Sequence, residues 1–117
     1  ERMISNVNLK PDLAWIKQFK RVVIFGLGYG GKQIEHLLEL YSKDTKRVFT
    51  DDTEQEKKDF IRFNDLIFDK NDVIIISIYD KDIYEKIQKR LLIKKVNQSQ
   101  IMWIGASKLL IDIIIAT

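Results

Sequence analysis

The segment at residues 21–32, RVVIFGLGYGGK, constrains the fold of this 117-residue chain more than any other. Residues 22–25 are a continuous run of β-branched and aromatic side chains, which is typical of a strand buried on both faces. Four glycines follow within six residues, and apolar residues then recur at helical spacing, at Ile34, Leu37, Leu38 and Tyr41. A strand that passes through a glycine turn into a helix predicts the first unit of a parallel α/β sheet.

The glycines match the spacing G-x-G-x-x-G at Gly26, Gly28 and Gly31. In a nucleotide-binding loop, the first glycine makes the turn, the second lets the backbone approach a pyrophosphate, and the third lets the helix pack closely. The helix N-terminus adds unpaired N–H groups and a partial positive charge. We therefore expect this loop to bind phosphates, with a tight turn that binds no ligand as the alternative.

Three polar or aromatic residues lie in or near this loop. Tyr29 is expected to stack on a ligand, or else to shield the helix N-terminus. Lys32 is a candidate phosphate contact, although the G-x-x-x-x-G-K-[ST] spacing of a P-loop is absent. His36, the only histidine, falls between the apolar positions of its helix and is expected on the surface.

An acidic pair, Asp51 and Asp52, ends a second predicted strand at residues 47–50, and Asp51 lies 20 positions after Gly31. Dinucleotide-binding folds place an acid there to accept hydrogen bonds from ribose hydroxyls. Either aspartate suits this role, and a structural cap is the alternative for each. An acid at this point argues against a cofactor with a 2′-phosphate, because the negative charges would repel.

Two further strands are predicted at residues 73–78 and 100–104, the first of them almost purely β-branched and therefore central in a parallel sheet. Residues 53–70 are not assigned, with an edge strand or a helix start as alternatives at residues 60–63. The alternation of strands and helices predicts an α/β fold, a small Rossmann-like three-layer domain with a mostly parallel sheet of four or five strands.

A helix between these two strands is indicated by Asp82 and Glu85, which resemble a capping box. Its expected apolar face contains Ile83, Ile87 and Leu91.

Ligands of open α/β sheets bind outside the carboxyl ends of the strands. This rule places Ser77 and Tyr79, and also residues 105–107, beside the glycine loop. Ser77 and Tyr79 carry donors for a base or a sugar, while covering the sheet edge is the alternative for Tyr79.

Composition excludes several classes of site. The 20 basic and 17 acidic residues are interspersed and leave a net charge of +3, so no nucleic-acid face is expected. The absence of cysteine excludes disulfides and thiolate metal sites, and no metal site is predicted. No apolar run approaches the ~20 residues of a membrane span, so membrane insertion is not expected and a cytoplasmic location is the default.

The motifs VVIFGLGYGGK at 22–32, VFTDD at 48–52 and DVIIISI at 72–78 together resemble the small Rossmann-like domains of bacterial sugar-modifying proteins. Examples are the N-terminal domain of amino-sugar N-acetyltransferases and domains of sugar-nucleotide dehydratases. The resemblance implies a role in surface-polysaccharide or glycoprotein biosynthesis. It also implies phosphate contacts at Gly26, Gly28, Gly30 and Gly31, with Asp51 or Asp52 near the nucleoside.

Residues 1–20 are predicted to be an extension with a short helix, and residues 21–117 a domain that binds a nucleotide, a nucleotide-sugar or NAD. We expect this domain to belong to a larger protein whose additional domain is catalytic, because no catalytic residue is recognisable. Formation of a homo-oligomer stays open.

Two other functions are weighed against this one. An NAD-binding module of an oxidoreductase or epimerase would be marked by a Tyr-x-x-x-Lys pair, but Ile83 follows Tyr79 and Gln88 follows Tyr84 at that spacing. A regulatory nucleotide-sensing domain would be marked by a Gly-Asp pair, which is absent between residues 60 and 72.

Overall fold

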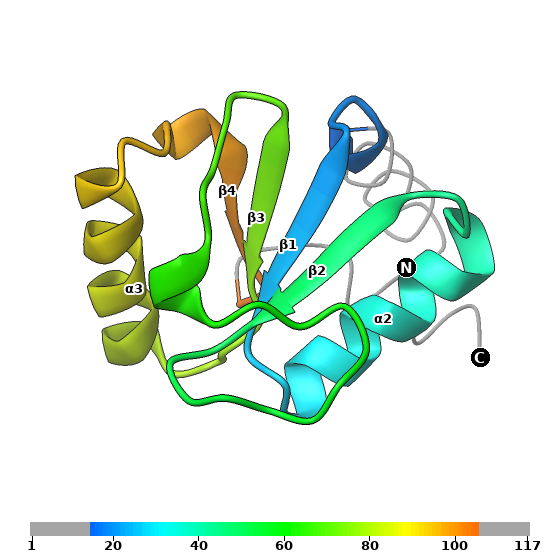
Figure 1. Cartoon of the computed structure of the whole chain (residues 1–117), viewed down its shortest axis with the longest axis horizontal. Helices are drawn as coiled ribbons and strands as arrows, with labels where there is room; N and C mark the ends of the chain where they lie inside the picture. The colour runs from blue at the N-terminus through cyan, green and yellow to red at the C-terminus, as the bar shows by residue number, and fades with distance from the viewer. Residues whose placement is uncertain (1–14, 106–117) are drawn as a thin grey trace, which may run out of the picture.

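The computed structural model describes residues 15–105, which form a parallel sheet with helices on both sides (Figure 1). The strands lie in the order β2-β1-β3-β4, with bounds β1 (Arg21–Phe25), β2 (Lys46–Thr50), β3 (Asp72–Ile76) and β4 (Ile101–Trp103). The other elements are α2 (Tyr29–Tyr41), α3 (Lys81–Ile93) and the 3-10 turns η1 (Phe63–Asp65) and η2 (Gln98–Gln100). The predicted α/β fold with a mostly parallel sheet of four or five strands is confirmed, and the described residues form four strands, all parallel.

Both faces of the sheet are buried, as the apolar strand sequences require. Side chains point to opposite faces alternately, so Ile24 and Ile75 join one core and Val23 and Ile74 the other. The first core includes Ile34, Leu37 and Leu38 of α2, and the second includes Ile87 and Leu91 of α3. The two helices therefore cover opposite faces, which gives three layers (Figure 1).

Strand β1 lies in the centre of the sheet, with β2 on one side and β3 on the other. Its last residue, Phe25, is in register with Thr50 of β2 and Ile76 of β3. The carboxyl ends of these three strands are therefore level, and the loops that follow them start from one edge.

The segment between β2 and β3 crosses the sheet without an α-helix among its residues. Phe60 forms an isolated parallel bridge with Phe49, and η1 begins at Phe63. Both alternatives for residues 60–63 are therefore present in a short form, the edge strand as this bridge and the helix start as η1. Phe63 and Leu66 are buried in the core beside α3, and these two side chains hold the extended crossover against that face.

The N-cap of α3 differs from the prediction. The carboxylate of Asp80, not that of Asp82, caps the helix, and its Oδ1 accepts a hydrogen bond of 3.1 Å from the Ile83 N–H. The capping box predicted for Asp82 and Glu85 is wrong because an N-cap needs extended backbone, which Asp80 has and a residue inside the first turn lacks. Ile83 is 44% exposed and does not join the core.

The third strand is shorter than predicted and ends at Ile76. Beyond it, the Ile78 carbonyl accepts a hydrogen bond from the Trp103 side chain. Of the predicted N-terminal extension, residues 15–20 are described, and Ile16 is fully buried in the core beside α2. The predicted loop residues 106–107 lie outside the described residues.

Candidate functional site

The carboxyl edge of the sheet brings together the loops after β1, β2 and β3. The chain leaves β1 to form β2 on one side and later returns to form β3 on the other. A crevice at such a switch of direction is where open α/β sheets bind ligands. The structure therefore places the predicted residues of the glycine loop, Asp51 and Asp52, and residues 77–79 on one edge.

Three of the four loop glycines are required by packing within the protein. Gly26 has φ +110°, and a Cβ there would lie 2.7 Å from Ser77 Oγ. A Cβ at Gly30 would overlap the Ser77 carbonyl oxygen, and one at Gly31 would overlap the Gly26 carbonyl oxygen. These glycines let β1, β3 and α2 approach closely. The predicted phosphate contacts of Gly30 and Gly31 would come through their backbone N–H groups, whereas the Gly26 N–H already donates to the Thr50 carbonyl oxygen at 3.0 Å.

Gly28 is the exception, because a Cβ at this position would meet no atom within 4 Å. It is the N-cap of α2 and is exposed. The amides of residues 29–31 have no hydrogen-bond acceptor among the described residues, and the first turn contains no acid. Open space therefore adjoins the N-cap at the positive end of the helix dipole, whose first-turn amides are unpaired, an arrangement that suits an anion.

Ser77 is buried, and its hydroxyl donates to the Phe25 carbonyl oxygen at 2.8 Å and lies 3.3 Å from that of Gly26. The hydroxyl predicted to contact a base or a sugar thus serves to position the glycine turn. The Trp103 Nε1–H donates to the Ile78 carbonyl oxygen at 2.7 Å. Contacts from both neighbouring strands therefore hold the loop that carries Tyr79.

Tyr29 and Tyr79 present two aromatic rings beside the open N-terminus of α2. Tyr29 is 74% exposed and Tyr79 is 40% exposed, so both rings are accessible. The Tyr79 hydroxyl donates to Gln33 Oε1 and so links the loop after β3 to α2. Burial raises the pKa of Tyr79 above its ordinary value of 10.0, and the nearby Tyr29 raises it further. Both tyrosines lie where a ligand's ring or sugar would pack.

The two aspartates after β2 have different surroundings. Asp52 forms an ion pair with Arg90 of α3, with two N–H···O contacts of 3.1 and 2.5 Å. Asp51 is half-buried, and its Oδ1 accepts from the Asp52 N–H, whereas Oδ2 has no partner within residues 15–105. Asp51 is therefore the better candidate for ribose hydroxyls.

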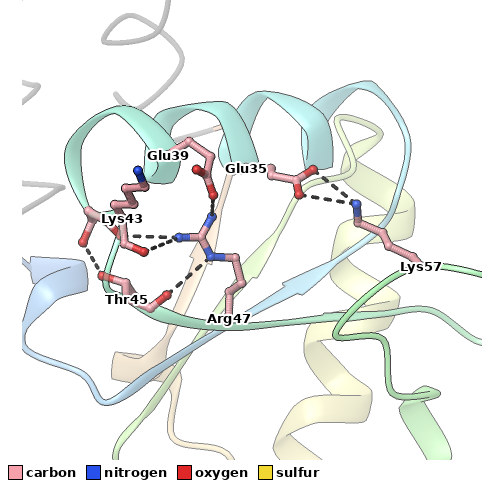
Figure 2. Close-up of polar contacts among 7 residues, drawn as sticks. Glu35, Glu39, Lys43, Thr45, Arg47 and Lys57 are labelled. Carbon is pink, nitrogen blue, oxygen red and sulfur yellow. Dashed lines mark hydrogen bonds and ion pairs between the residues drawn. The ribbon is translucent and has the colours of Figure 1, made fainter.

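A cavity of about 280 Å³ lies between α2 and the crossover that follows β2. Leu27, Gly31 and Phe49 are among its lining residues. Lys57 also lines it, and its ammonium lies 3.3 Å from Glu35 (Figure 2). The same ammonium lies 4.4 Å from the centre of the Phe49 ring.

No sequence signal identifies the contact between Glu35 and Lys57, since these residues are 22 positions apart.

Two kinds of feature are absent from the part of the chain that the structure describes. No three His, Asp or Glu side chains gather there as metal ligands. None of the helices within residues 15–105 has both the length and the apolar character needed to cross a bilayer. His36 is exposed, as expected.

Comparisons with models of protein families, with curated proteins and with solved structures gave no match to this chain.

Proposed function

We propose that this domain binds a nucleotide through its diphosphate at the N-terminus of α2. The observation that carries the proposal is the open approach at Gly28, where a Cβ would meet no atom within 4 Å, next to a first helical turn whose amides at residues 29–31 have no acceptor among the described residues. Gly30 and Gly31 have packing roles, so their presence is explained without a ligand. The exposed, unobstructed N-cap at Gly28 has no such packing explanation.

The rest of the edge supports a nucleoside attached to those phosphates. Asp51 offers a carboxylate oxygen at the end of β2, the position of the ribose-binding acid in dinucleotide folds. Tyr29 and Tyr79 offer exposed ring faces, and each ring carries a hydroxyl group at its edge. We propose nucleotide-sugars as the first class of ligand, because the sequence motifs resemble those of bacterial sugar-modifying proteins. NAD is the second candidate ligand.

The proposal is tested by calorimetry with a uridine diphosphate-sugar, a thymidine diphosphate-sugar and NAD, using wild type and Gly28→Asp. An aspartate is a preferred N-cap, so folding stability should be kept. Its carboxylate would occupy the amides and repel a diphosphate, so affinity should fall at least tenfold. Asn64→Asp adds the same charge at an exposed site in η1 and should leave affinity within twofold.

Two results would overturn the proposal. One is a folded wild-type protein that binds none of these nucleotides. The other is a nucleotide that binds Gly28→Asp as tightly as wild type, because its phosphates would then lie elsewhere.

A further inference from the structure

A second cavity, of about 570 Å³, lies at the end of the sheet opposite the glycine loop. It is lined by residues that precede β1 and by the turn between α2 and β2, so it adjoins the amino ends of these strands. Four of its lining residues are lysines, Lys17, Lys20, Lys43 and Lys46. Since parallel strands run from this edge to the glycine loop, the two sites are separate.

The charge of this cavity is unbalanced. Four lysines face one acid, Asp44, which leaves a net charge of +3, as much as the whole chain carries. None of the four lysines forms an ion pair with an acid in the described range. The lining of this cavity is therefore predominantly basic.

The turn that carries Lys43 and leads into Lys46, the first residue of β2, is held by Arg47 (Figure 2). The guanidinium contacts the carbonyl oxygens of Ser42, Lys43 and Thr45 at 3.5, 3.2 and 3.4 Å. It also pairs with Glu39 at 2.9 Å, so this nearby carboxylate is already bound to a cation. Arg47 thus positions the turn.

We propose that this cavity binds a small molecule that carries two or more phosphate groups. Lysine ammonium groups bind phosphates as mobile point charges, and several around one cavity suit clustered phosphates better than a single anion. The cavity has the volume of a small-molecule site. Phe19 provides an apolar wall, and the hydroxyl groups of Ser42 and Thr45, which also line the cavity, are hydrogen-bonded to each other. The same phosphate chemistry occurs in free metabolites and in phosphoinositide headgroups.

The first test is an NMR titration with inorganic triphosphate. It uses the Gly28→Asp variant, because this substitution removes binding at the glycine loop. Amide shifts are expected at residues 42–46. Lys43→Gln/Lys46→Gln should weaken this binding at least tenfold. Lys86→Gln/Lys89→Gln removes the same charge from exposed positions on α3 and should change it less than twofold.

The source of the phosphates is decided by a second measurement, sedimentation with phosphatidylcholine vesicles that contain phosphatidylinositol bisphosphate. If the protein binds triphosphate but does not sediment with the vesicles, the ligand is a free molecule. If the protein sediments with the vesicles and Lys43→Gln/Lys46→Gln abolishes this, the ligand is a lipid headgroup. The proposal is overturned if neither probe binds, if both lysine pairs affect binding equally, or if the shifts spread over the surface. Because the glycine loop is disabled in the titrated variant, these outcomes are independent of the proposed nucleotide site.

Discussion

The Ser77 hydroxyl donates a hydrogen bond of 2.8 Å to the carbonyl oxygen of Phe25, 52 positions away in the sequence. The Ser77 N–H donates to the same oxygen at 3.0 Å. Together these contacts join the residue that follows β3 to the last residue of β1. The glycine turn begins at the next residue, Gly26, so Ser77 determines where the turn lies relative to Tyr79.

Replacing Ser77 by alanine should lower the free energy of unfolding by about 1 kcal/mol, because a buried hydrogen bond is lost while the Phe25 carbonyl keeps its N–H partner. Urea unfolding would measure the change. Thr53→Ala, which removes an exposed hydroxyl, should stay within about 0.5 kcal/mol of wild type. Equal effects of the two substitutions would contradict the role given to Ser77.

The loop glycines should differ in their tolerance to substitution. Gly30→Ala and Gly31→Ala should each lower the free energy of unfolding by more than about 2 kcal/mol, because the new methyl group would overlap a backbone carbonyl oxygen. Gly28→Ser should stay within about 0.5 kcal/mol or stabilise, since serine is a good N-cap and the space is open. Thermal unfolding of the three variants would reveal whether this order holds, and a Gly28→Ser variant as unstable as the others would refute it.

The Arg21–Asp72 ion pair should contribute strongly to stability. Asp72 has 5% of its side chain exposed and accepts two N–H···O bonds of 2.9 Å from Arg21. Arg21→Met should cost about 3 kcal/mol, because it leaves a buried carboxylate without its cation. Arg62→Met breaks the exposed pair with Asp65 and should cost less than about 0.5 kcal/mol. Chemical denaturation measures the free energy of unfolding of both variants. Equal losses in Arg21→Met and Arg62→Met would contradict the stabilising role of the Arg21–Asp72 pair.

The ionisation of Tyr79 should couple to folding at high pH. Its pKa is raised in the folded protein, first by burial and then by Tyr29, so the folded state holds the proton more tightly than the unfolded chain. The stability that this confers is complete below pH 10 and is lost as the pH rises through the folded pKa. Tyr79→Phe should therefore reduce the loss of stability above pH 10.

An NMR titration of the tyrosine Cζ signals measures this pKa directly. Tyr29→Phe should lower the pKa of Tyr79 but keep it above 10, because burial is the larger cause. A Tyr79 signal that titrates at or below pH 10 in wild type would show that the surrounding protein does not disfavour the ionised ring.

Local sequence patterns predicted most of the fold. The β-branched run before the glycines gave the position of β1 to within one residue, and the helical spacing of Ile34, Leu37 and Leu38 identified the buried face of α2. These predictions succeeded because the period of apolar residues reflects the same burial that forms the element. The helix start at Asp80 was missed because Asp80 and Asp82 are both acids, and either one fits the sequence pattern of an N-cap.

The sequence alone determined the order of the elements, the parallel sheet and the glycine spacing of the loop, since each depends on residues close together in the chain. Only the tertiary structure decided that Gly28 is the open glycine, that Asp52 pairs with Arg90 while Asp51 keeps an oxygen available, and that Ser77 supports the turn. Such roles depend on which distant segments meet across the sheet, and residue type and local spacing do not specify those contacts.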